Sequence, residues 1–461
     1  MNFLVSYTSR CNLRLNINLH FIKSFLNNEK RYSSSLYIPG NKANKVLSFL
    51  RPDLNFDNYF EDLQKTEKEL NLRGYKADLE YLKANWHSYK VLTLKKIKLE
   101  KELKKYSNQI SIVKNNNATS GDTSNLNDLI NKCKCVKTDL KLIKENIWNI
   151  EEVVIPELLK LPNNIDKRTP IEFPVILKTV GQKPDIIEDA IDHVSIGTEL
   201  GLLEYKSAIQ YFLCNEAVVF ECGILSIAGR ILNDSGIMRV AGPDFCRSIV
   251  IEGAGIDHQS PLNSFIIKDS DNLEINRLHV VGSASAPALL AIYTKKIIQE
   301  KDFPVKIFNT GRQYVPIIRE LATYGLFAVC QASAVQTQTN DENYQDELEN
   351  LINVTSKIYD EIGSHYQVVI KTTKDLDLSE RMRVSFEMWS SYLNCYIEVG
   401  HISVCGDYFS KRLLIGCKSS NNVKFPAAIT GTLLSVPKIL GCLFEENPKK
   451  FVVPENVKGF F

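Results

Sequence analysis

The feature that most constrains the fold is a long, unbroken repeat of apolar side chains in residues 126–154. Its members are separated alternately by three and four residues: Leu126, Leu129, Cys133, Val136, Leu140, Ile143, Ile147, Ile150 and Val154. This alternation places every member on one stripe of an α-helix and is typical of a coiled-coil seam. The segment therefore predicts a long helix that packs against a second helix.

A second, slightly less regular seam precedes the first, formed by Leu92, Leu99, Leu103, Tyr106, Ile110 and Val113. A polar stretch at residues 115–122 separates the two seams, and its Asn, Ser and Gly residues break helices. We therefore predict an antiparallel helical hairpin within residues 55–160. Helices of about 30 residues would make this arm about 45 Å long. Residues 156–164 close the arm, and Pro162, Pro170 and Pro174 mark a loop region after it.

The first helix of the arm carries a cluster of positive charge. Residues 90–105 contain two glutamates, Glu100 and Glu102, and seven lysines: Lys90, Lys95, Lys96, Lys98, Lys101, Lys104 and Lys105. In an isolated helix, this pattern is typical of a solvated face with ion pairs four residues apart. Lysines also bind phosphate backbones, because each neutralised phosphate releases counterions. The charges alone leave both a structural face and an RNA-binding face open.

The N-terminus has the composition of a targeting segment. Residues 1–28 contain Arg10, Arg14 and Lys23 but no Asp or Glu, and serines occupy positions 33–35. An acid-free, basic, amphipathic start that ends in serines is typical of a mitochondrial presequence. We expect a transit peptide over residues 1–34, with cleavage near Arg31–Ser35. The alternative is a frayed terminus without a targeting role.

Length, charge and cysteine content set the remaining limits. A chain of 461 residues is long enough for two or three domains. A net charge of +2 gives no global preference for nucleic acid, so any basic surface must be local. No apolar run reaches the roughly 18 residues that span a bilayer, so we expect no membrane span. The 11 cysteines lack metal-ligand spacing, which predicts reduced, mostly buried thiols and no metal site.

Residues 381–413 have the pattern of two half-buried strands, a turn and a basic helix. Their order is Phe386-Glu387-Met388-Trp389, Tyr396-Ile397-Glu398-Val399, Ser403-Val404-Cys405-Gly406-Asp407-Tyr408 and Lys411-Arg412-Leu413. This order resembles the seryl-tRNA synthetase family, whose catalytic sheet carries E-V-W and then Y-x-E-V-x-S-C-S-x-C-x-D-Y-Q-x-R-R-L. His401-Ile402 stands where that family has Ser-Cys.

The resemblance covers roughly residues 55–450 and implies an α+β fold. It implies an N-terminal antiparallel coiled-coil hairpin, followed in residues 171–461 by a class II synthetase-like antiparallel sheet with flanking helices. It also implies that residues 208–243 form a dimer interface and that the hairpin faces the long variable arm of tRNA(Ser). The resemblance thereby favours RNA contact by the lysines of residues 90–105.

The resemblance further locates the pocket for serine and ATP, where most chemical residues are replaced. Ser283 and Ser285 fall in the family's G-T-A-E, with Ser285 at the glutamate. The second motif's Y-R-x-E falls at residues 314–317, with Val315 and Ile317, or, if anchored on Phe308, at Asn309 and Gly311. Neither placement gives an arginine and a glutamate. In the motif's far half, Arg, His, Phe, Lys and the serine-binding Glu become Ala328, Cys330, Ala332, Ala334 and Gln336.

The third motif is altered as well. Thr430 replaces the asparagine of H-T-L-N-G-T, and Lys438 replaces the class-defining arginine. Pro437 is expected to disturb the helix of this motif. Of the expected pocket residues, only Glu398 and the positive charge of Lys438 persist. The loss of even one donor that stabilises the transition state costs about 2.7–4 kcal/mol. The sequence therefore predicts a pseudoenzyme with no catalytic residues and no cofactor.

With its presequence, the chain resembles the seryl-tRNA synthetase-like insect mitochondrial proteins, a group of paralogues within the family. The resemblance implies a location in the mitochondrial matrix and a heterodimer with mitochondrial seryl-tRNA synthetase, since an interface motif can pair related subunits. Two alternatives stay open: a divergent but active serine–tRNA ligase that uses Glu398 and Lys438, and a free-standing RNA-binding homodimer. The isolated histidines are expected to be structural or on the surface: His193, His258, His279, His365 and His401.

Overall fold

The structure is a computed structural model that describes residues 34–37, 52, 55–116, 123–185, 189–267, 277–316, 325–328, 331–341, 344–419 and 422–459. Side chains are not described for residues 114–116, 123–125, 331–341, 419 and 422. The expected presequence up to Ser33 and the centre of the polar tip lie outside these ranges. Residues Ser34–Phe461 form one unit, to which the following description applies. None of the described helices has the length and apolar character that crossing a bilayer requires.

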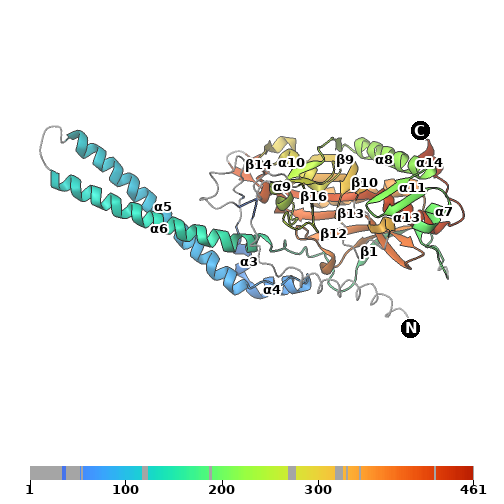
Figure 1. The fold of residues 1–461 in the computed structure, drawn as a ribbon, viewed down its shortest axis with the longest axis horizontal. Helices are drawn as coiled ribbons and strands as arrows, with labels where there is room; N and C mark the ends of the chain where they lie inside the picture. The colour runs from blue at the N-terminus through green and yellow to red at the C-terminus, as the bar shows by residue number, and fades with distance from the viewer. Residues whose placement is uncertain are drawn as a thin grey trace. The chain divides into compact units, whose positions relative to one another are not determined.

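The arm predicted from the two seams is present as α5 (Leu79–Asn116) and α6 (Thr123–Leu159), which lie side by side as a hairpin (Figure 1). Two short helices precede it, α3 (Asp57–Glu61) and α4 (Leu63–Leu72). With 38 and 37 residues, α5 and α6 exceed the expected length. At 1.5 Å per residue they are about 57 Å long. The estimate of about 45 Å was too short because α5 begins well before its apolar seam.

The predicted seam of α6 is the side that packs on α5. Its members are buried or half-buried throughout, and the most buried are Cys133, Leu140, Ile147 and Val154. Lys144 of α6 also binds Glu100 of α5, with Nζ and Oε1 3.7 Å apart. Pro156 lies inside the last turns of α6 and does not end the helix.

The base of the arm is organised around Trp86 of α5. Its ring meets Phe56 edge-on and stacks on Tyr89, with ring centroids 5.3 Å apart in both contacts. Its indole N–H donates to the Asp57 carboxylate over 2.8 Å. The same carboxylate binds the Lys90 ammonium over 2.7 Å. Aromatic packing and one shared carboxylate thus join α3 to α5.

The C-terminal half is built on an eight-stranded sheet of order β1-β11-β12-β13-β16-β10-β9-β4. Neighbouring strands are antiparallel, except that β4 runs parallel to β9 at one edge. The strands are β1 (Val175–Val180), β11 (Tyr366–Ile370), β12 (Met382–Ser390), β13 (Cys395–Gly406), β16 (Ala427–Ser435), β10 (Gln331–Asp341), β9 (Val305–Tyr314) and β4 (Met238–Arg239). An antiparallel sheet combined with helices is the α+β architecture that the sequence predicted.

Three helices pack on one face of this sheet: α8 (Glu216–Asp234), α11 (Tyr344–Ile362) and α13 (Val436–Glu446). Together with the central strands they form the larger hydrophobic cluster, in which the ring of Tyr359 stacks on Phe386. At Gly400 of β13, a Cβ atom would lie 2.2 Å from the carbonyl oxygen of Leu433. This close approach of two backbones requires glycine.

Shorter elements form two three-stranded sheets, of order β15-β14-β8 and β5-β7-β6, and the hairpin β2-β3. The strands are β2 (Leu203–Ser207), β3 (Gln210–Leu213), β5 (Phe245–Arg247), β6 (Phe265–Ile266), β7 (Leu278–Val280), β8 (Ile297–Gln299), β14 (Gly416–Ser419) and β15 (Asn422–Lys424). The helices are α7 (His193–Glu199), α9 (Ser248–Gly253), α10 (Ala286–Tyr293), α12 (Tyr408–Leu413) and α14 (Glu455–Lys458). Residues 381–413 thus form two strands and a helix, as predicted.

Pro437 does not disturb the helix of the third motif, so that prediction was wrong. Helix α13 begins at Val436, and Pro437 lies in its first turn. The N–H groups of a first turn have no partner within the helix, and the fixed φ of proline suits this position.

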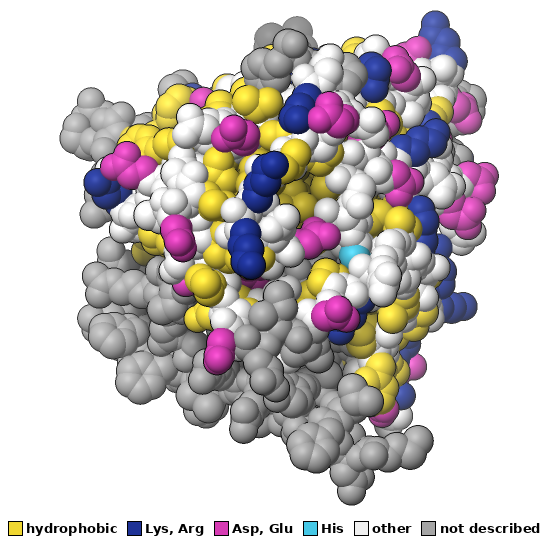
Figure 2. All heavy atoms as spheres, turned by 90° about the vertical axis from the view of Figure 1, so that its right-hand side faces the viewer, with side chains coloured by type: hydrophobic (Ala, Val, Ile, Leu, Met, Phe, Trp, Pro, Cys, Tyr) yellow, Lys and Arg dark blue, Asp and Glu magenta, His cyan; other side chains and the backbone are white. Residues whose placement is uncertain are grey.

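The protein surface carries both signs of charge. Figure 2 shows one face, on which hydrophobic side chains are interleaved with Lys and Arg and with Asp and Glu. Neither sign dominates this face, in keeping with a net charge of +2.

Candidate functional site

The centre of the sheet is polar on the face opposite α8, α11 and α13. Side chains alternate between the two faces of a strand. The residues directly before and after buried Phe386 in β12 therefore point to this polar face. Antiparallel pairing places Ser385 of β12 opposite His401 of β13, and Arg383 opposite Ser403. Ser403 in turn lies opposite Thr430 of β16. Thr430 therefore lies five residues along β13 from the position of Glu398, about 17 Å away.

Glu398 lies within this polar face, with 24% of its side chain exposed. Its Oε2 accepts a hydrogen bond from the Ser385 hydroxyl over 2.9 Å. Its Oε1 lies 3.4 Å from Nδ1 of His401 and 3.6 Å from Nη1 of Arg383. Burial raises the pKa of Glu398, but Arg383, His401 and Lys438 outweigh burial and hold that pKa well below its usual range. Glu398 is therefore a charged carboxylate that already contacts basic groups of its own chain.

Arg383 is committed to carboxylates of the same chain. Its guanidinium donates to Glu380 over 2.9 and 3.0 Å and to Asp377 over 2.5 Å, besides its ion pair with Glu398. Burial lowers the pKa of Arg383, but these three carboxylates raise it well above its usual value. The side chain is only 13% exposed. This arginine is thus a charge-neutralising residue of the pocket floor.

Lys438 occupies the position of the class-defining arginine, at the start of α13. Burial lowers its pKa, while the nearby Glu398 opposes that change and Arg383 adds to it. An ammonium group carries charge but lacks the planar fork of donors that a guanidinium offers to phosphate. The structure therefore brings together Glu398 and Lys438, two of the positions that the sequence assigned to the pocket, whereas Thr430 lies farther along the sheet, opposite Ser403.

Ser285, which the resemblance places at a glutamate of the family, caps helix α10. Its hydroxyl donates to the carbonyl of Gly282 over 2.7 Å and accepts from the N–H of Ala288 over 3.4 Å. The preceding residue, Ser283, is tied to β9, because the Asn309 amide donates to the Ser283 carbonyl over 2.7 Å. The hydroxyl that replaces the carboxylate thus serves the backbone of its own loop.

The two placements of the second motif lead to different positions. Asn309 lies within β9, opposite Gln336 of β10, whereas Val315 lies beyond the end of β9 and is exposed. Ala328 is half-buried in a short 3₁₀ turn. Arg312 of β9, which the sequence did not single out, binds Glu221 of α8 over 3.0 Å. Ile317, Cys330 and the side chains of Ala332, Ala334 and Gln336 lie outside the described part of the chain.

The lysines of the arm fall into different environments. Lys90 binds Asp57 and belongs to the base of the arm, and Lys96 is half-buried. The other members of the cluster are exposed on α5: Lys95, Lys98, Lys101, Lys104 and Lys105. Only this exposed set is positioned to meet a large anionic partner.

Several histidines are buried and hydrogen-bonded, as predicted for structural residues. Nδ1 of His193 lies 2.8 Å from Glu445, and its Nε2 accepts from the N–H of Leu326 over 3.0 Å. The rings of His258 and His279 are both buried, with centroids 6.4 Å apart. Burial, aided by the charge of His258, lowers the pKa of His279 to about 4.

Metal chemistry finds no support among the residues that the structure describes. No group of three or more His, Cys, Asp and Glu side chains is arranged there to hold a metal ion. The described cysteines are free thiols, and Cys133 and Cys405 are buried, as predicted.

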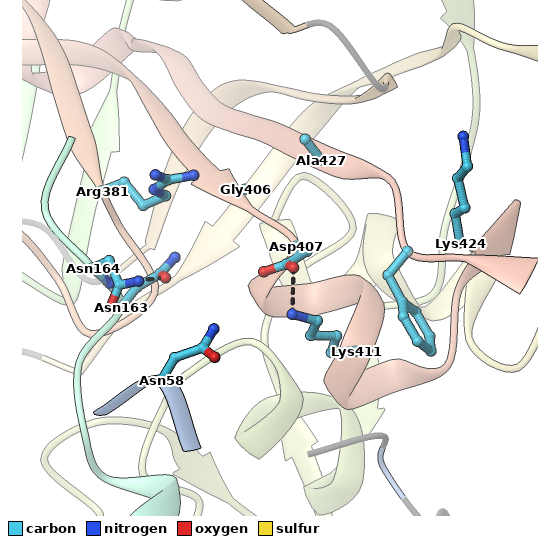
Figure 3. Close-up of a pocket in the computed structure, with 10 residues that line it drawn as sticks. Asn58, Asn163, Asn164, Arg381, Gly406, Asp407, Lys411, Lys424 and Ala427 are labelled. Atoms are coloured by element: carbon cyan, nitrogen blue, oxygen red, sulfur yellow. Dashed lines mark hydrogen bonds and ion pairs between the residues drawn. The ribbon is translucent and has the colours of Figure 1, made fainter. Parts of the chain in front are cut away.

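A cavity of about 500 Å³ lies at the far end of β13 (Figure 3). Eight residues along the strand separate its Gly406 from Glu398, a distance of about 27 Å. Its walls are Asn58, Asn163, Asn164, Arg381, Gly406, Asp407, Lys411, Lys424, Phe425 and Ala427. Asp407 binds Lys411 over 2.5 Å, and Nε of Arg381 is buried without a hydrogen-bond partner among the described residues. Three cations against one carboxylate favour an anionic occupant.

Sequence reasoning missed this cavity because its walls come from segments that are far apart in the chain. Arg381, Asp407 and Lys411 belong to the recognised stretch of residues 381–413, whereas Asn163 belongs to the segment that closes the arm. Its amide donates to the carbonyl oxygens of Ser379 and Cys405 over 2.9 and 2.7 Å. Pro162-Asn163 was therefore the one available indication that this segment contacts the end of β13.

Comparison with known proteins assigns the fold. Residues 270–447 match the class II core domain of the tRNA synthetases for G, H, P, S and T. A solved structure, seryl-tRNA synthetase from Pyrococcus horikoshii complexed with ATP, has a TM-score of 0.70 at 17% identity. The match covers 88% of this chain and 98% of that chain, so the fold is that of a seryl-tRNA synthetase.

Two relatives extend the likeness over nearly the whole chain. The serine–tRNA synthetase-like protein Slimp of Drosophila melanogaster is 26% identical over 427 residues, which are 90% of this chain and 89% of that protein. The mitochondrial serine–tRNA ligase of Mus musculus is 22% identical over 442 residues, covering 92% and 84%. Residues 270–447 thus resemble a class II tRNA synthetase core domain, within a chain that is similar over nearly its whole length to seryl-tRNA synthetase-like and seryl-tRNA ligase proteins.

Proposed function

We propose that this chain is a catalytically inactive, mitochondrial seryl-tRNA synthetase-like protein. In this proposal it pairs with mitochondrial seryl-tRNA synthetase as a regulatory subunit and contacts RNA. The observation that carries the proposal is the state of the pocket. Glu398 contacts Arg383 and His401, and Arg383 also binds Glu380 and Asp377.

The chemistry of amino-acid activation explains why this state opposes catalysis. Activation needs a carboxylate for the amino acid's ammonium and cations for the ATP phosphates. Here the acidic and basic groups neutralise one another, and a hydroxyl that caps a helix stands at one carboxylate position. Each lost donor costs about 2.7–4 kcal/mol of transition-state stabilisation. Several simultaneous losses would remove the activity.

Pairing with a related subunit is supported by exposed apolar side chains. The segment that resembles the family's dimer motif, with the residues that follow it, exposes Ile209, Phe212, Val218, Met238 and Phe245. Large apolar side chains are costly to leave in water, and protein interfaces cover such surfaces. The same residues could serve a homodimer, so the pairing partner must be decided by experiment.

The proposed location rests on the N-terminal segment, and the proposed RNA contact rests on helix α5. The acid-free residues 1–28 support import, and the relatives include a mitochondrial serine–tRNA ligase. The five exposed lysines of α5 support RNA binding, because between residues 95 and 105 they outnumber the two glutamates, Glu100 and Glu102. Phosphate binding by such a face is expected to depend strongly on salt.

The absence of catalysis can be tested on the purified full chain. We expect no serine-dependent exchange of pyrophosphate into ATP and no rise in melting temperature with ATP. An intact site at 100 times its Kd would gain about 2.7 kcal/mol of stability. The active mitochondrial synthetase is the positive control. Measurable exchange would refute the proposal and favour the alternative of a divergent ligase.

The subunit role can be tested by co-expression with mitochondrial seryl-tRNA synthetase from the same organism. Native mass should reveal a one-to-one complex, and serylation or the stability of the partner should rise. Met238→Glu or Phe212→Glu should abolish the complex, while Ile297→Glu, an exposed aliphatic of β8, should leave it intact. Two separate homodimers with unchanged serylation would contradict this role.

RNA contact can be tested by changing the five exposed lysines of α5 to glutamine. We expect weaker binding of tRNA(Ser) and a salt dependence of log K reduced by up to about 0.9 per lysine. Matched changes on α6, at Lys132, Lys134, Lys137 and Lys141, are the control for general loss of charge. Unchanged binding in the α5 variant would show that its lysines form a structural face only.

A further inference from the structure

The first described residues of the chain are buried in the protein. The backbone at Ser34–Tyr37 follows directly on the expected presequence, yet Ser35 is 1% exposed and Leu36 is fully buried. Leu36 belongs to the second hydrophobic cluster, with Trp86 from the arm and Ile251 from α9. A segment that serves only as a spacer would not be buried in this way.

The polar partner of this segment is the carboxylate of Glu252 on α9, which is 5% exposed. Its Oε2 accepts the backbone N–H groups of both Ser35, over 2.5 Å, and Leu36, over 2.8 Å. The ring of His258 lies beside them, with Nε2 3.1 Å from the Ser35 hydroxyl and 3.7 Å from the same Oε2. A buried carboxylate is costly unless opposite charge and hydrogen bonds compensate it.

The next residue connects the segment to the arm. The Tyr37 hydroxyl donates to Glu151 of α6 over 2.6 Å and lies 2.9 Å from the Tyr89 hydroxyl of α5. Burial, with Tyr89 and Glu151, raises the pKa of Tyr37. We call Ser35–Tyr37 with Glu252 and Glu151 the N-terminal clamp, since it joins both arm helices to α9.

We propose that the presequence is removed between Ser34 and Ser35, and that the new α-ammonium group of Ser35 binds the buried carboxylate of Glu252. Hydrolysis of this peptide bond consumes one water, leaves a carboxylate on Ser34 and gives Ser35 a protonated amine. The inference goes beyond the proposed function and shares with it only the expectation of a cleaved leader. It assigns both a processing site and the site that binds its product.

The geometry favours an ammonium group at this position. The Ser35 nitrogen lies 2.5 Å from Glu252 Oε2, and a charged donor makes a stronger bond there than a neutral amide does. One bond is lost with Ser34, whose hydroxyl accepts the Tyr37 N–H. Because Ser34 and Ser35 are both buried, hydrolysis must precede closure of the clamp.

The processing site is tested by expressing the full chain in cells and recovering it from their mitochondria. Intact mass and N-terminal sequencing should identify Ser35 as the first residue. A first residue at any other position would overturn the assignment of the cleavage site. Recovery of an uncleaved chain from the organelle would overturn it as well.

The binding site is tested by a double-mutant cycle in recombinant protein. Residues Ser34–Phe461 form one unit with its own hydrophobic clusters, so chains that begin at Ser35 retain the core. Glu252→Gln is made in a chain that begins at Ser35 and in one that begins at Ser33, where position 35 keeps an amide. The melting temperature should fall by about 1 °C more in the shorter chain, the effect of roughly 1 kcal/mol in a chain of this size. Equal losses would overturn the ion pair.

A second measurement covers the case in which Glu252→Gln does not fold. In the unaltered chain that begins at Ser35, the buried α-amine should react with an amine-acylating reagent at least tenfold more slowly than the α-amine of the chain that begins at Ser33. Equal acylation rates would show an exposed terminus and refute the clamp. Glu300→Gln, which removes an exposed carboxylate, is the control for the general effect of losing a negative charge in the Glu252→Gln variants.

Discussion

Replacement of Arg383 by methionine tests whether the pocket is held together by its own charges. The change removes the one guanidinium that binds Asp377, Glu380 and Glu398 and keeps an unbranched apolar side chain. The side chain of Glu380 is 4% exposed and that of Glu398 is 24% exposed. Both carboxylates would lose this ion-pair partner at positions where water solvates their charge poorly. Breaking a buried ion pair on one side costs about 3–5 kcal/mol, and we expect a loss of this size.

The dependence on pH gives the prediction a second, independent part. In the unaltered protein the pKa of Glu398 lies well below the usual glutamate value of 4.5. The stability that Glu398 contributes is therefore present above that value and is lost as the pH falls through the lower, folded-state pKa. In the Arg383→Met variant, burial acts with less opposition and raises the pKa of Glu398. The stranded carboxylates can then take up protons, so the deficit of the variant should shrink between pH 7 and pH 4.

Urea unfolding followed by tryptophan fluorescence measures both parts, because the ring of Trp389 is buried in β12. Lys458→Met is the control, since it removes an exposed ion pair with Glu455 and should cost less than about 1 kcal/mol. A loss for Arg383→Met as small as that of the control would refute the reasoning. A deficit that stays constant from pH 7 to pH 4 would refute the electrostatic part alone.

Three further predictions concern the scaffold. Gly400→Ala should lower stability by about 1–3 kcal/mol, because its Cβ would lie 2.2 Å from a carbonyl oxygen; Gly242→Ala, whose nearest contact is 3.8 Å away, should not change the melting temperature. Leu140→Ala on the buried seam should cost about 2–5 kcal/mol, seen as earlier loss of helical circular dichroism, whereas exposed Leu142→Ala should be neutral. Burial lowers the pKa of His279 from 6.5 to about 4, so the unfolded chain takes up the proton first and stability should fall as the pH drops from 6.5 to 4. His279→Gln should flatten that slope, which is at most about 1.4 kcal/mol per pH unit.

Elements with a strong local pattern could be predicted from the sequence. The arm was predicted because the seam through Leu140 repeats without a skip, and periodicity alone determines which side of a helix is buried. The strand pair around Glu398 was predicted for the same reason, with a period of two. Helix ends were less accurate, since α5 begins at Leu79, well before its seam. Pro437 was misjudged because its effect depends on a helix start that no pattern fixes.

The polar contacts could not be predicted, because they join distant segments. The predicted loss of the pocket's chemical residues rests on single positions such as Ser285 and Lys438. No sequence pattern indicated that Arg383 would neutralise Glu398, since the pairing depends on strand register. The bond between Ser35 and Glu252 joins residues 217 positions apart. No local period links them, and only the packing of α9 against the N-terminal segment brings them together.

The order of strands in the main sheet has a consequence for how the protein is made. In the described sheet, edge strand β1 pairs with β11. Val175 therefore cannot form its strand pair until Ile370, 195 residues later in the chain, has been synthesised. At 5–20 residues per second, this delay is about 10–40 s during synthesis, whereas the α5–α6 hairpin closes on neighbouring sequence and can form in microseconds. During this delay β1 is an unpaired strand that carries the apolar side chains of Ile176 and Leu177. Both side chains are exposed even in the folded protein. Such a strand is a template for aggregation, so efficient production should depend on a chaperone that covers β1 until β11 arrives.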